Sequence, residues 1–405
     1  MIVQGSQALL DTAAPARKVF ISATALQVEL LTTEAEFDSL QTAWDQLLAE
    51  SDQRVFFLCW SWNRLWWRTY APPESQLYLL ACRDAEGNLL GLAPLYWQQR
   101  RWAGVPHIRD LNFLGTGAGI KTSEHLDIFA RRGFERACAE ACAAFLSQRH
   151  DWDRLWLWNI PDRSKVLPHF HRTLGEAARI SLCDQLYYVA TDGDWETIKR
   201  DWSRQVSHTL ERRMNKLRKD YAVEFHRVET PDELAPALDD FVRLHQMRWT
   251  TKGESGSFAY PKFEAFLRTA VGQALSEDRL GFWTLKLDGQ CAATLLVFVD
   301  NGVAHYFQGG FDVSYAKYSL GSVMMAQCIQ ACVADSKICE FDLMGGGAAY
   351  KDSWTKNARA AYELELFRPG WRATLYQTGL KTRRALGRVR RALRARFQST
   401  VQQQA

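Results

Sequence analysis

The feature that most constrains the fold is an order of elements that the sequence predicts twice. In each half, a hairpin of two apolar strands is followed by a third strand, a helix and a fourth strand. The second hairpin has the clearer turn, because Asp288 and Gly289 are a strong signal for a tight connection. The predicted elements are residues 77–82, 89–96, 125–130, 134–147 and 154–159 in the first half, and 281–287, 291–299, 302–309, 320–334 and 339–344 in the second. The repeat predicts a duplicated α/β (α+β) fold with a mixed sheet in each copy.

The length of the chain also favours two domains. Its 405 residues, 47% of them hydrophobic, exceed what one core usually accommodates. We expect an N-terminal extension over residues 1–24, a first domain over 25–193 and a second over 194–370.

The longest apolar stretch, residues 291–299, is far shorter than the roughly 20 residues that cross a membrane. With no secretory signal pattern at the N-terminus, we expect a cytoplasmic protein. Nine cysteines without a CxxC pair predict neither a disulfide framework nor a metal site.

The remaining segment, residues 371–405, is strongly basic. It contains nine Lys and Arg residues and no Asp or Glu. Four apolar residues recur in it at helical spacing: Leu386, Val389, Leu393 and Phe397. A cationic helix with one apolar stripe can bind an anionic membrane surface, or it can pack on the acidic remainder of its own chain. We expect the first, a peripheral attachment at the inner face of the membrane.

Several stretches carry a family resemblance. In the second half they are LHQMRW at residues 244–249, the hairpin LDGQCAATLLVF, the run HYFQGGFDVSYAKYSLGSVMM, and FDLMGGGAAYKDSW at residues 341–354. In the first half the weaker marks are FFLCWSWNRLWWRTY, LNFLGTG and Ser123-x-x-x-Asp127. Together they resemble the CelD/BcsL-type acetyltransferases of cellulose biosynthesis, which belong to the GNAT superfamily and are related to the Fem-type aminoacyl transferases.

The resemblance implies two tandem GNAT-like domains, each with a mixed, mostly antiparallel sheet flanked by helices. It also implies transfer of an acyl group, in the first place acetyl, from a coenzyme A thioester to an amine or hydroxyl. The acceptor would be a polysaccharide, a cell-envelope precursor or a related metabolite. Such a transferase needs donors for the pyrophosphate of the thioester, a base for the proton of the acceptor, and a group that stabilises the tetrahedral oxyanion.

The start of the predicted helix 320–334 is the candidate coenzyme A site. Ser319 is predicted to cap this helix, and Gly321 and Ser322 fall in its first turn, where free N–H groups favour an anion. Lys317 adds a positive charge. The usual fingerprint of the superfamily, Gln/Arg-x-x-Gly-x-Gly/Ala, is reduced here to the single Gly321.

The glycine-rich loop after residues 339–344 supplies the catalytic candidates. GGGAAYK lacks the spacing of a phosphate-binding P-loop. Its glycines allow a sharp turn and the close approach of a ligand, and they direct Tyr350 and Lys351 toward the C-terminal edge of the strand. The resemblance implies that Lys351 faces the reacting carbonyl and stabilises the oxyanion, and Tyr350 could protonate the leaving thiolate. His305, His245 and Asp342 are candidates for the base, and the sequence does not choose among them.

Acceptor binding is predicted near residue 250. His245, Arg248, Trp249 and Lys252 lie close to the end of a helix that begins near Leu234. The cations beside an indole could hold an anionic or sugar-bearing acceptor, or they could stabilise the end of the helix.

A different class of function also fits this sequence. The chain could be a non-catalytic duplicated GNAT module that binds a lipid-linked sugar, a nucleotide or a partner in envelope synthesis. Nucleic-acid binding is not expected, because the tryptophans follow core periodicity and do not alternate with Lys and Arg.

Overall fold

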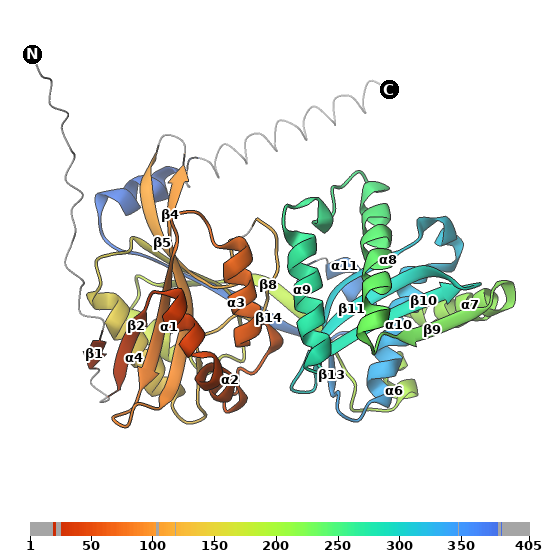
Figure 1. Cartoon of the computed structure of the whole chain (residues 1–405), viewed down its shortest axis with the longest axis horizontal. Coiled ribbons are helices and arrows are strands. Elements are labelled where there is room, and N and C mark those ends of the chain that lie inside the picture. Colours follow the sequence, from red (N-terminus) through yellow and green to blue (C-terminus); the bar gives the residue numbers. More distant parts are fainter. Residues whose placement is uncertain are drawn as a thin grey trace, which may run out of the picture.

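A single mixed sheet runs through both halves of the chain (Figure 1). The computed structural model describes residues 19–21, 26–102, 105–117, 119–346, 348–379 and 382. The strand order is β1-β2-β3-β4-β5-β7-β14-β8-β13-β12-β11-β10-β9, with β6 beside β4. The strands are β1 (Val19–Ile21), β2 (Gln27–Leu31), β3 (Gln76–Arg83), β4 (Leu89–Trp102), β5 (Val105–Phe113), β6 (Phe129–Ala130), β7 (Arg154–Pro161), β8 (Arg179–Ala190), β9 (Val223–Arg227), β10 (Leu280–Leu287), β11 (Gln290–Asp300), β12 (Val303–Phe311), β13 (Glu340–Met344) and β14 (Ala358–Phe367).

The helices flank this sheet in two lobes that meet near its centre (Figure 1). The α-helices are α1 (Glu34–Ser39), α2 (Gln41–Ala49), α3 (Trp60–Tyr70), α4 (Glu135–Gln148), α5 (Leu167–Leu174), α6 (Trp195–Arg200), α7 (Arg204–Asp220), α8 (Pro231–Thr250), α9 (Phe263–Ser276), α10 (Leu320–Ala334) and α11 (Ala348–Lys351). Short 3-10 turns are η1 (Phe56–Leu58), η2 (Ser257–Ala259) and η3 (Val313–Tyr318).

The repeat of hairpin, strand, helix and strand is present, but the third strand of the first half is β5 at Val105–Phe113 and not the predicted residues 125–130. The hairpin β3–β4, strand β5, helix α4 and strand β7 correspond to the hairpin β10–β11, strand β12, helix α10 and strand β13. In both halves the strands that flank the helix are parallel, β5 with β7 and β12 with β13, whereas the other pairs are antiparallel. The mixed and mostly antiparallel character of the sheet is therefore as expected.

The expectation of a separate sheet in each copy was wrong. After β7 the chain forms β8, which pairs with β13 of the second half, and the final strand β14 inserts between β7 and β8. Each half thus receives its last strand from the other. This exchange gives hydrogen-bond partners to two strand edges that would otherwise expose unpaired backbone groups. It also means that the sheet does not divide at residue 193, where the sequence places the boundary.

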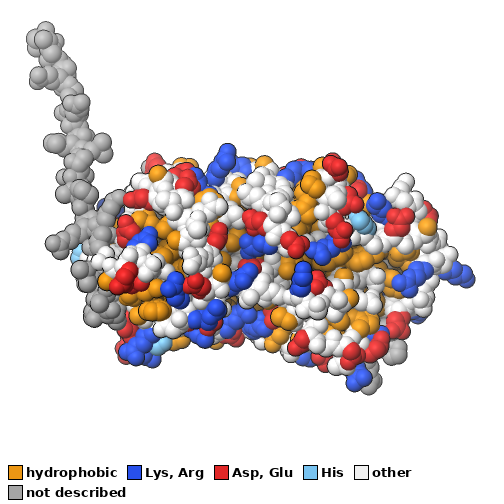
Figure 2. Space-filling view, turned by 60° about the horizontal axis from the view of Figure 1, so that its bottom comes forward, with side chains coloured by type: hydrophobic (Ala, Val, Ile, Leu, Met, Phe, Trp, Pro, Cys, Tyr) orange, Lys and Arg blue, Asp and Glu red, His pale blue; other side chains and the backbone are white. Residues whose placement is uncertain are grey.

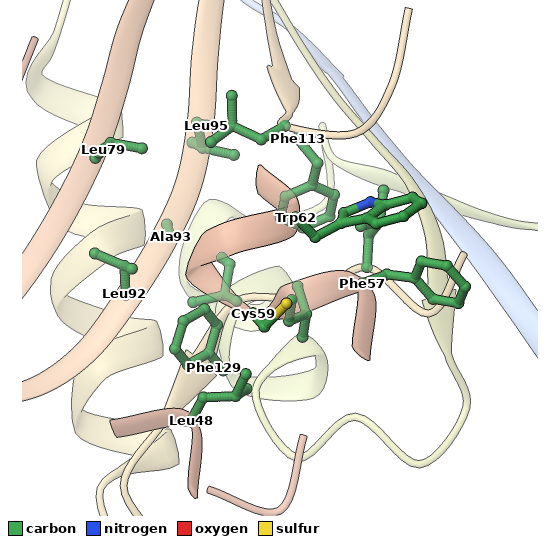
Figure 3. Close-up of a cluster of buried hydrophobic side chains, with 14 of the residues drawn as sticks. Leu48, Phe57, Cys59, Trp62, Leu79, Leu92, Ala93, Leu95, Phe113 and Phe129 are labelled. Atoms are coloured by element: carbon green, nitrogen blue, oxygen red, sulfur yellow. The ribbon is translucent and has the colours of Figure 1, made fainter. Parts of the chain in front are cut away.

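The hydrophobic cores also extend across the two halves. The larger core contains Trp62 of α3 beside Phe57 (Figure 3), and it continues into the second half through Phe298 and Phe266. The ring centroids of Trp62 and Phe266 of α9 are 5.0 Å apart. The second core lies between the other face of β10–β13 and helices α7 and α10. Helix α9 and strand β11 therefore pack the second lobe against α3 and η1 of the first.

Local sequence explains where α8 begins. Thr230 and Glu233 form a reciprocal capping box, and Pro231 occupies the first helical position. The helix places Phe241 and Leu244 in the core and carries Arg248 to its C-terminal turn. It begins three residues earlier than the sequence predicted.

The strand predicted at residues 125–130 is mostly absent. Only β6 at its end is a strand, and residues 119–128 form an irregular segment that packs inside the protein. Its side chains Thr122, Ser123, Glu124, His125 and Asp127 are all buried. They bond with other segments of the chain, so the alternation of polar and apolar residues does not reflect a sheet.

Acidic and basic side chains are interspersed on the face of the molecule shown in Figure 2. Among the helices of the described residues, none is long and apolar enough to span a bilayer. The basic segment with Leu386, Val389, Leu393 and Phe397 lies outside the described residues, and membrane attachment through it stays a prediction.

Candidate active site

A pocket lies at the C-terminal end of β12, beside β11 and the start of α10. Strand β12 pairs with β13 only from Val303 with Glu340 to His305 with Asp342, and it then continues without β13 beside it. The pocket has a volume of about 420 Å³. It is lined by Arg248, Thr294, Leu295, Tyr306, Gly309, Gly310, Phe311, Asp312, Tyr315, Ala316, Ser319, Leu320, Gly321, Ser322, Met324, Met325, Tyr350 and Trp354. The predicted residues Arg248, Ser319, Gly321, Ser322 and Tyr350 thus share one cavity.

The start of α10 borders this pocket, but Ser319 does not cap it as predicted. Ser319 has a left-handed backbone, with φ of 52°, and its side chain makes no capping bond. Its carbonyl oxygen instead accepts hydrogen bonds from the N–H groups of Ser322 and Val323. Lys317 does not line the pocket, and its ammonium lies 4.8 Å from the ring centroid of Tyr318.

Gly321 is required by close packing. A Cβ atom at this position would lie 2.8 Å from the ring of Phe311, which itself lines the pocket. We expect Gly321→Ala to displace this ring and to weaken binding of a coenzyme A thioester about tenfold, measured by calorimetry. Gly272→Ala on α9 is the matched control, since a Cβ there meets nothing within 4 Å. Equal affinity in the two variants would contradict a ligand beside Phe311.

The glycine turn after β13 is held by acidic side chains of the first half. The N–H of Gly345 donates to Glu124 Oε2 at 2.6 Å, and the N–H of Gly346 donates to Asp184 Oδ1 at 3.1 Å. A side chain at Gly345 would collide with the Asp184 carboxylate, and Gly346 has a positive φ of 77°. Lys121 forms ion pairs with both acids. The turn is therefore built by both halves together.

Tyr350 and Lys351 leave this turn toward different surroundings. Tyr350 lines the pocket, and desolvation together with the neighbouring Tyr306 raises the pKa of its hydroxyl. Lys351 points to the C-terminal edge of β13 as expected, but it is only 4% exposed, whereas a loop position outside a core was predicted. Its Nζ donates to the carbonyl oxygens of Met344 at 2.8 Å and Gly345 at 2.6 Å. Burial lowers the pKa of Lys351 to about 8.

A cluster of two imidazoles and a carboxylate lies at the last paired position of β12 and β13. Asp342 Oδ2 is 2.6 Å from Nε2 of His125 and 3.5 Å from Nδ1 of His305, and each of the three residues is 1% exposed. The other carboxylate oxygen accepts from the N–H of Met344 at 2.6 Å. Although desolvation opposes it, the two imidazoles hold the pKa of Asp342 well below its usual range. Burial lowers the pKa of His305.

The same three side chains are the candidate metal ligands among the described residues. Their ligand atoms all lie within 4.8 Å of one another. Two ligands that each lie about 2.1 Å from one ion are usually roughly 3 Å apart, so the 2.6 Å separation of Asp342 Oδ2 and His125 Nε2 is short for a shared metal ion. The arrangement therefore fits a closely packed His–Asp–His cluster better than a metal centre.

The other predicted acceptor residues lie apart from the pocket. His245 is buried against Phe258, with ring centroids 5.0 Å apart, and burial lowers its pKa to about 4. The ammonium of Lys252 lies 5.6 Å from the ring centroid of Trp249. Of the four residues predicted near position 250, only Arg248 lines the pocket.

Sequence reasoning missed the contribution of the first half to this site. Lys121, Glu124, His125 and Asp184 were not predicted, yet they surround the glycine turn and Asp342. The available signal was the run Thr122–Asp127, in which five polar residues accompany one leucine and which extends into the strand predicted at residues 125–130. Buried polar runs of this kind indicate a segment held by specific partners.

Comparisons with known proteins bear on the segment that holds the pocket. Residues 204–352 match the family described as the acetyltransferase (GNAT) domain. The second half of the chain contains a GNAT-type acetyltransferase domain. All pocket residues except Trp354 lie within this GNAT domain.

Solved structures extend the likeness in fold to most of the chain. FemX superposes with a TM-score of 0.58 at 9% identity, covering 84% of this chain and 98% of its own. The C-terminal domain of a putative lysylphosphatidylglycerol synthetase from Agrobacterium fabrum gives a TM-score of 0.50 at 12% identity, covering 85% of this chain and 96% of its own. No curated protein matches the sequence significantly. These likenesses concern the fold and not the CelD/BcsL family specifically.

Proposed function

We propose that the protein is an acyltransferase that binds a coenzyme A thioester in the pocket between β11, β12 and the start of α10. The observation that carries this proposal is the position of the pocket. It lies within the segment that matches the GNAT domain, at the C-terminal end of β12, and the first turn of a 15-residue helix borders it. N–H groups at a helix start favour the phosphates of such a donor.

The reaction is assigned to Tyr350, which lines the pocket, and to Lys351, the next residue along the chain, which does not line it. The amine or hydroxyl of the acceptor attacks the thioester carbonyl and gives up its proton to water, because the buried cluster of His125, Asp342 and His305 does not line the pocket. The tetrahedral oxyanion is stabilised by the ammonium of Lys351, which has a third N–H beyond the two that bond Met344 and Gly345. Collapse breaks the C–S bond, and Tyr350 protonates the leaving thiolate.

The acceptor is proposed as a component of the cell envelope or a polysaccharide. The resemblance to CelD/BcsL-type acetyltransferases supports a glycan. The fold shared with FemX and with a putative lysylphosphatidylglycerol synthetase is compatible with an envelope component. Acetyl coenzyme A is the first donor to test.

Release of free thiol from acetyl coenzyme A tests the proposal. With envelope glycans or amino sugars as acceptors, we expect thiol release that depends on both substrates and falls about 100-fold in Tyr350→Phe, since this change removes the proton donor. Tyr260→Phe, an exposed tyrosine outside the pocket, is the control. Thioester binding without release for any acceptor would instead support the non-catalytic binding module.

A further inference from the structure

Arg248 places an uncompensated positive charge in the pocket. Its guanidinium lies 5.1 Å from the ring centroid of Phe311 and 5.6 Å from that of Trp249, and Nη1 donates to the Gly309 carbonyl at 3.3 Å. Among the described residues no carboxylate forms an ion pair with it, and its buried Nε has no hydrogen-bond partner. The acid that lines the pocket, Asp312, accepts instead from Ser314.

Six hydroxyl-bearing residues line the same pocket as this guanidinium, among them Tyr306, Tyr350 and Thr294. Tyr306 interacts through its hydroxyl with both Arg248 and Tyr350. Thr294 lies opposite Gly310 in the β11–β12 pair, one residue beyond the carbonyl that Arg248 contacts. The Thr294 side chain is 1% exposed, and its Oγ1 has no hydrogen-bond partner. Because buried donors without partners are costly, the Nε of Arg248 and the Oγ1 of Thr294 indicate a ligand that accepts hydrogen bonds.

We propose that Arg248, Tyr306 and Thr294 form a subsite for a carboxylate at the end of the acyl group, so that the preferred donor is a dicarboxylic acyl thioester such as a succinyl thioester. This inference rests on the proposed function. A guanidinium binds a carboxylate through parallel N–H bonds, and hydroxyl donors complete such a site. Tyr306 of this subsite contacts Tyr350, which protonates the thiolate at the reacting end of the donor. The first turn of α10 remains available to bind the phosphates of coenzyme A.

An oxyanion near Arg248 could also come from a phosphate of coenzyme A. The two sources are separated by comparing succinyl, butyryl and free coenzyme A. Butyryl matches succinyl in chain length but lacks the carboxylate, and free coenzyme A retains only the phosphates. Binding is measured by calorimetry and turnover by thiol release.

For the wild type we expect kcat/KM for succinyl coenzyme A to exceed that for butyryl coenzyme A at least tenfold. Arg248→Met, which removes the charge and retains much of the length, should lower the succinyl value about 100-fold and change the butyryl value less than threefold. Thr294→Val, which is nearly isosteric, should lower the succinyl value about tenfold. Arg243→Met removes a charge from the same helix without lining the pocket, and it should change neither value.

Other outcomes would overturn the carboxylate subsite. Equal weakening of succinyl, butyryl and free coenzyme A in Arg248→Met would assign the residue to a phosphate. A wild-type preference for butyryl would exclude a carboxylate at this position. If no thioester is turned over, the proposed reaction fails, but the calorimetric ranking of succinyl over butyryl still tests the subsite independently. Arg248→Lys keeps the charge and provides a folded alternative if the methionine variant unfolds.

Discussion

Asp342→Asn is expected to lower the free energy of unfolding by about 3 kcal/mol, which is the scale of breaking a buried ionic contact by removing one partner. Asp342 is buried between His125 and His305, and its anionic form is stabilised by both imidazoles. The amide would leave these rings without a negative partner in a site that water does not reach. Urea unfolding at pH 7, followed by tryptophan fluorescence, measures the loss.

A surface acid provides the matched control for this experiment. Asp239→Asn breaks the exposed contact of Asp239 with Arg268 and should cost no more than about 1 kcal/mol. If Asp342→Asn were as mild as this control, the cluster would contribute nothing to holding the two halves together.

The pH dependence of this contribution has a definite sign. Because the pKa of Asp342 is lowered on folding, its stabilising effect is complete above the pKa of an unfolded aspartate, about 3.9, and is lost as the pH falls through the lower folded value. The stability difference between wild type and Asp342→Asn should therefore be constant from pH 5 upward and shrink in strong acid. A difference that grows on acidification would contradict the anionic assignment.

The repeated element order could be predicted from the sequence because it depends on local signals. The Asp288-Gly289 turn and the helix at residues 320–334 occur where the apolar pattern placed them. Exchange of β8 and β14 leaves no such local signal, because the apolar pattern of a strand is the same whichever strand it pairs with. Sequence periodicity therefore predicted the elements of each half but not which strands of the two halves pair.

The candidate site was predicted only in part for a related reason. Arg248, Gly321 and Tyr350 were recognised by motif, and they do share a pocket. Lys351 was expected outside a core because it follows a glycine loop, whereas its ammonium binds two backbone carbonyls and the residue is only 4% exposed. Contacts between segments more than 200 residues apart, such as Glu124 with Gly345, have no trace in a single sequence.

Lys351→Met is expected to lower kcat between about 100-fold and 1,000-fold, the usual effect of losing one donor to a developing oxyanion. It should also destabilise the turn by about 1–3 kcal/mol, because the carbonyls of Met344 and Gly345 lose their donor. Lys356→Met, which removes an exposed lysine nearby, is the control for charge and should leave kcat unchanged. Thermal melts of both variants establish that the remaining activity is that of folded protein.

The pH profile separates a catalytic role of Lys351 from a merely structural one. Burial lowers its pKa from 10.5 to about 8, against the opposing effect of Glu124 and other acidic neighbours. If the ammonium stabilises the oxyanion, kcat of the wild type must fall as the pH rises through about 8, where the proton is lost. Lys351→Met should lack this descending limb, since its side chain does not titrate, and Lys351→Arg should move the limb to higher pH because a guanidinium keeps its charge. A wild-type rate that rises through pH 8 would instead indicate that the neutral amine of Lys351 acts as the base. Identical pH profiles in wild type and Lys351→Met would indicate that Lys351 only stabilises the glycine turn.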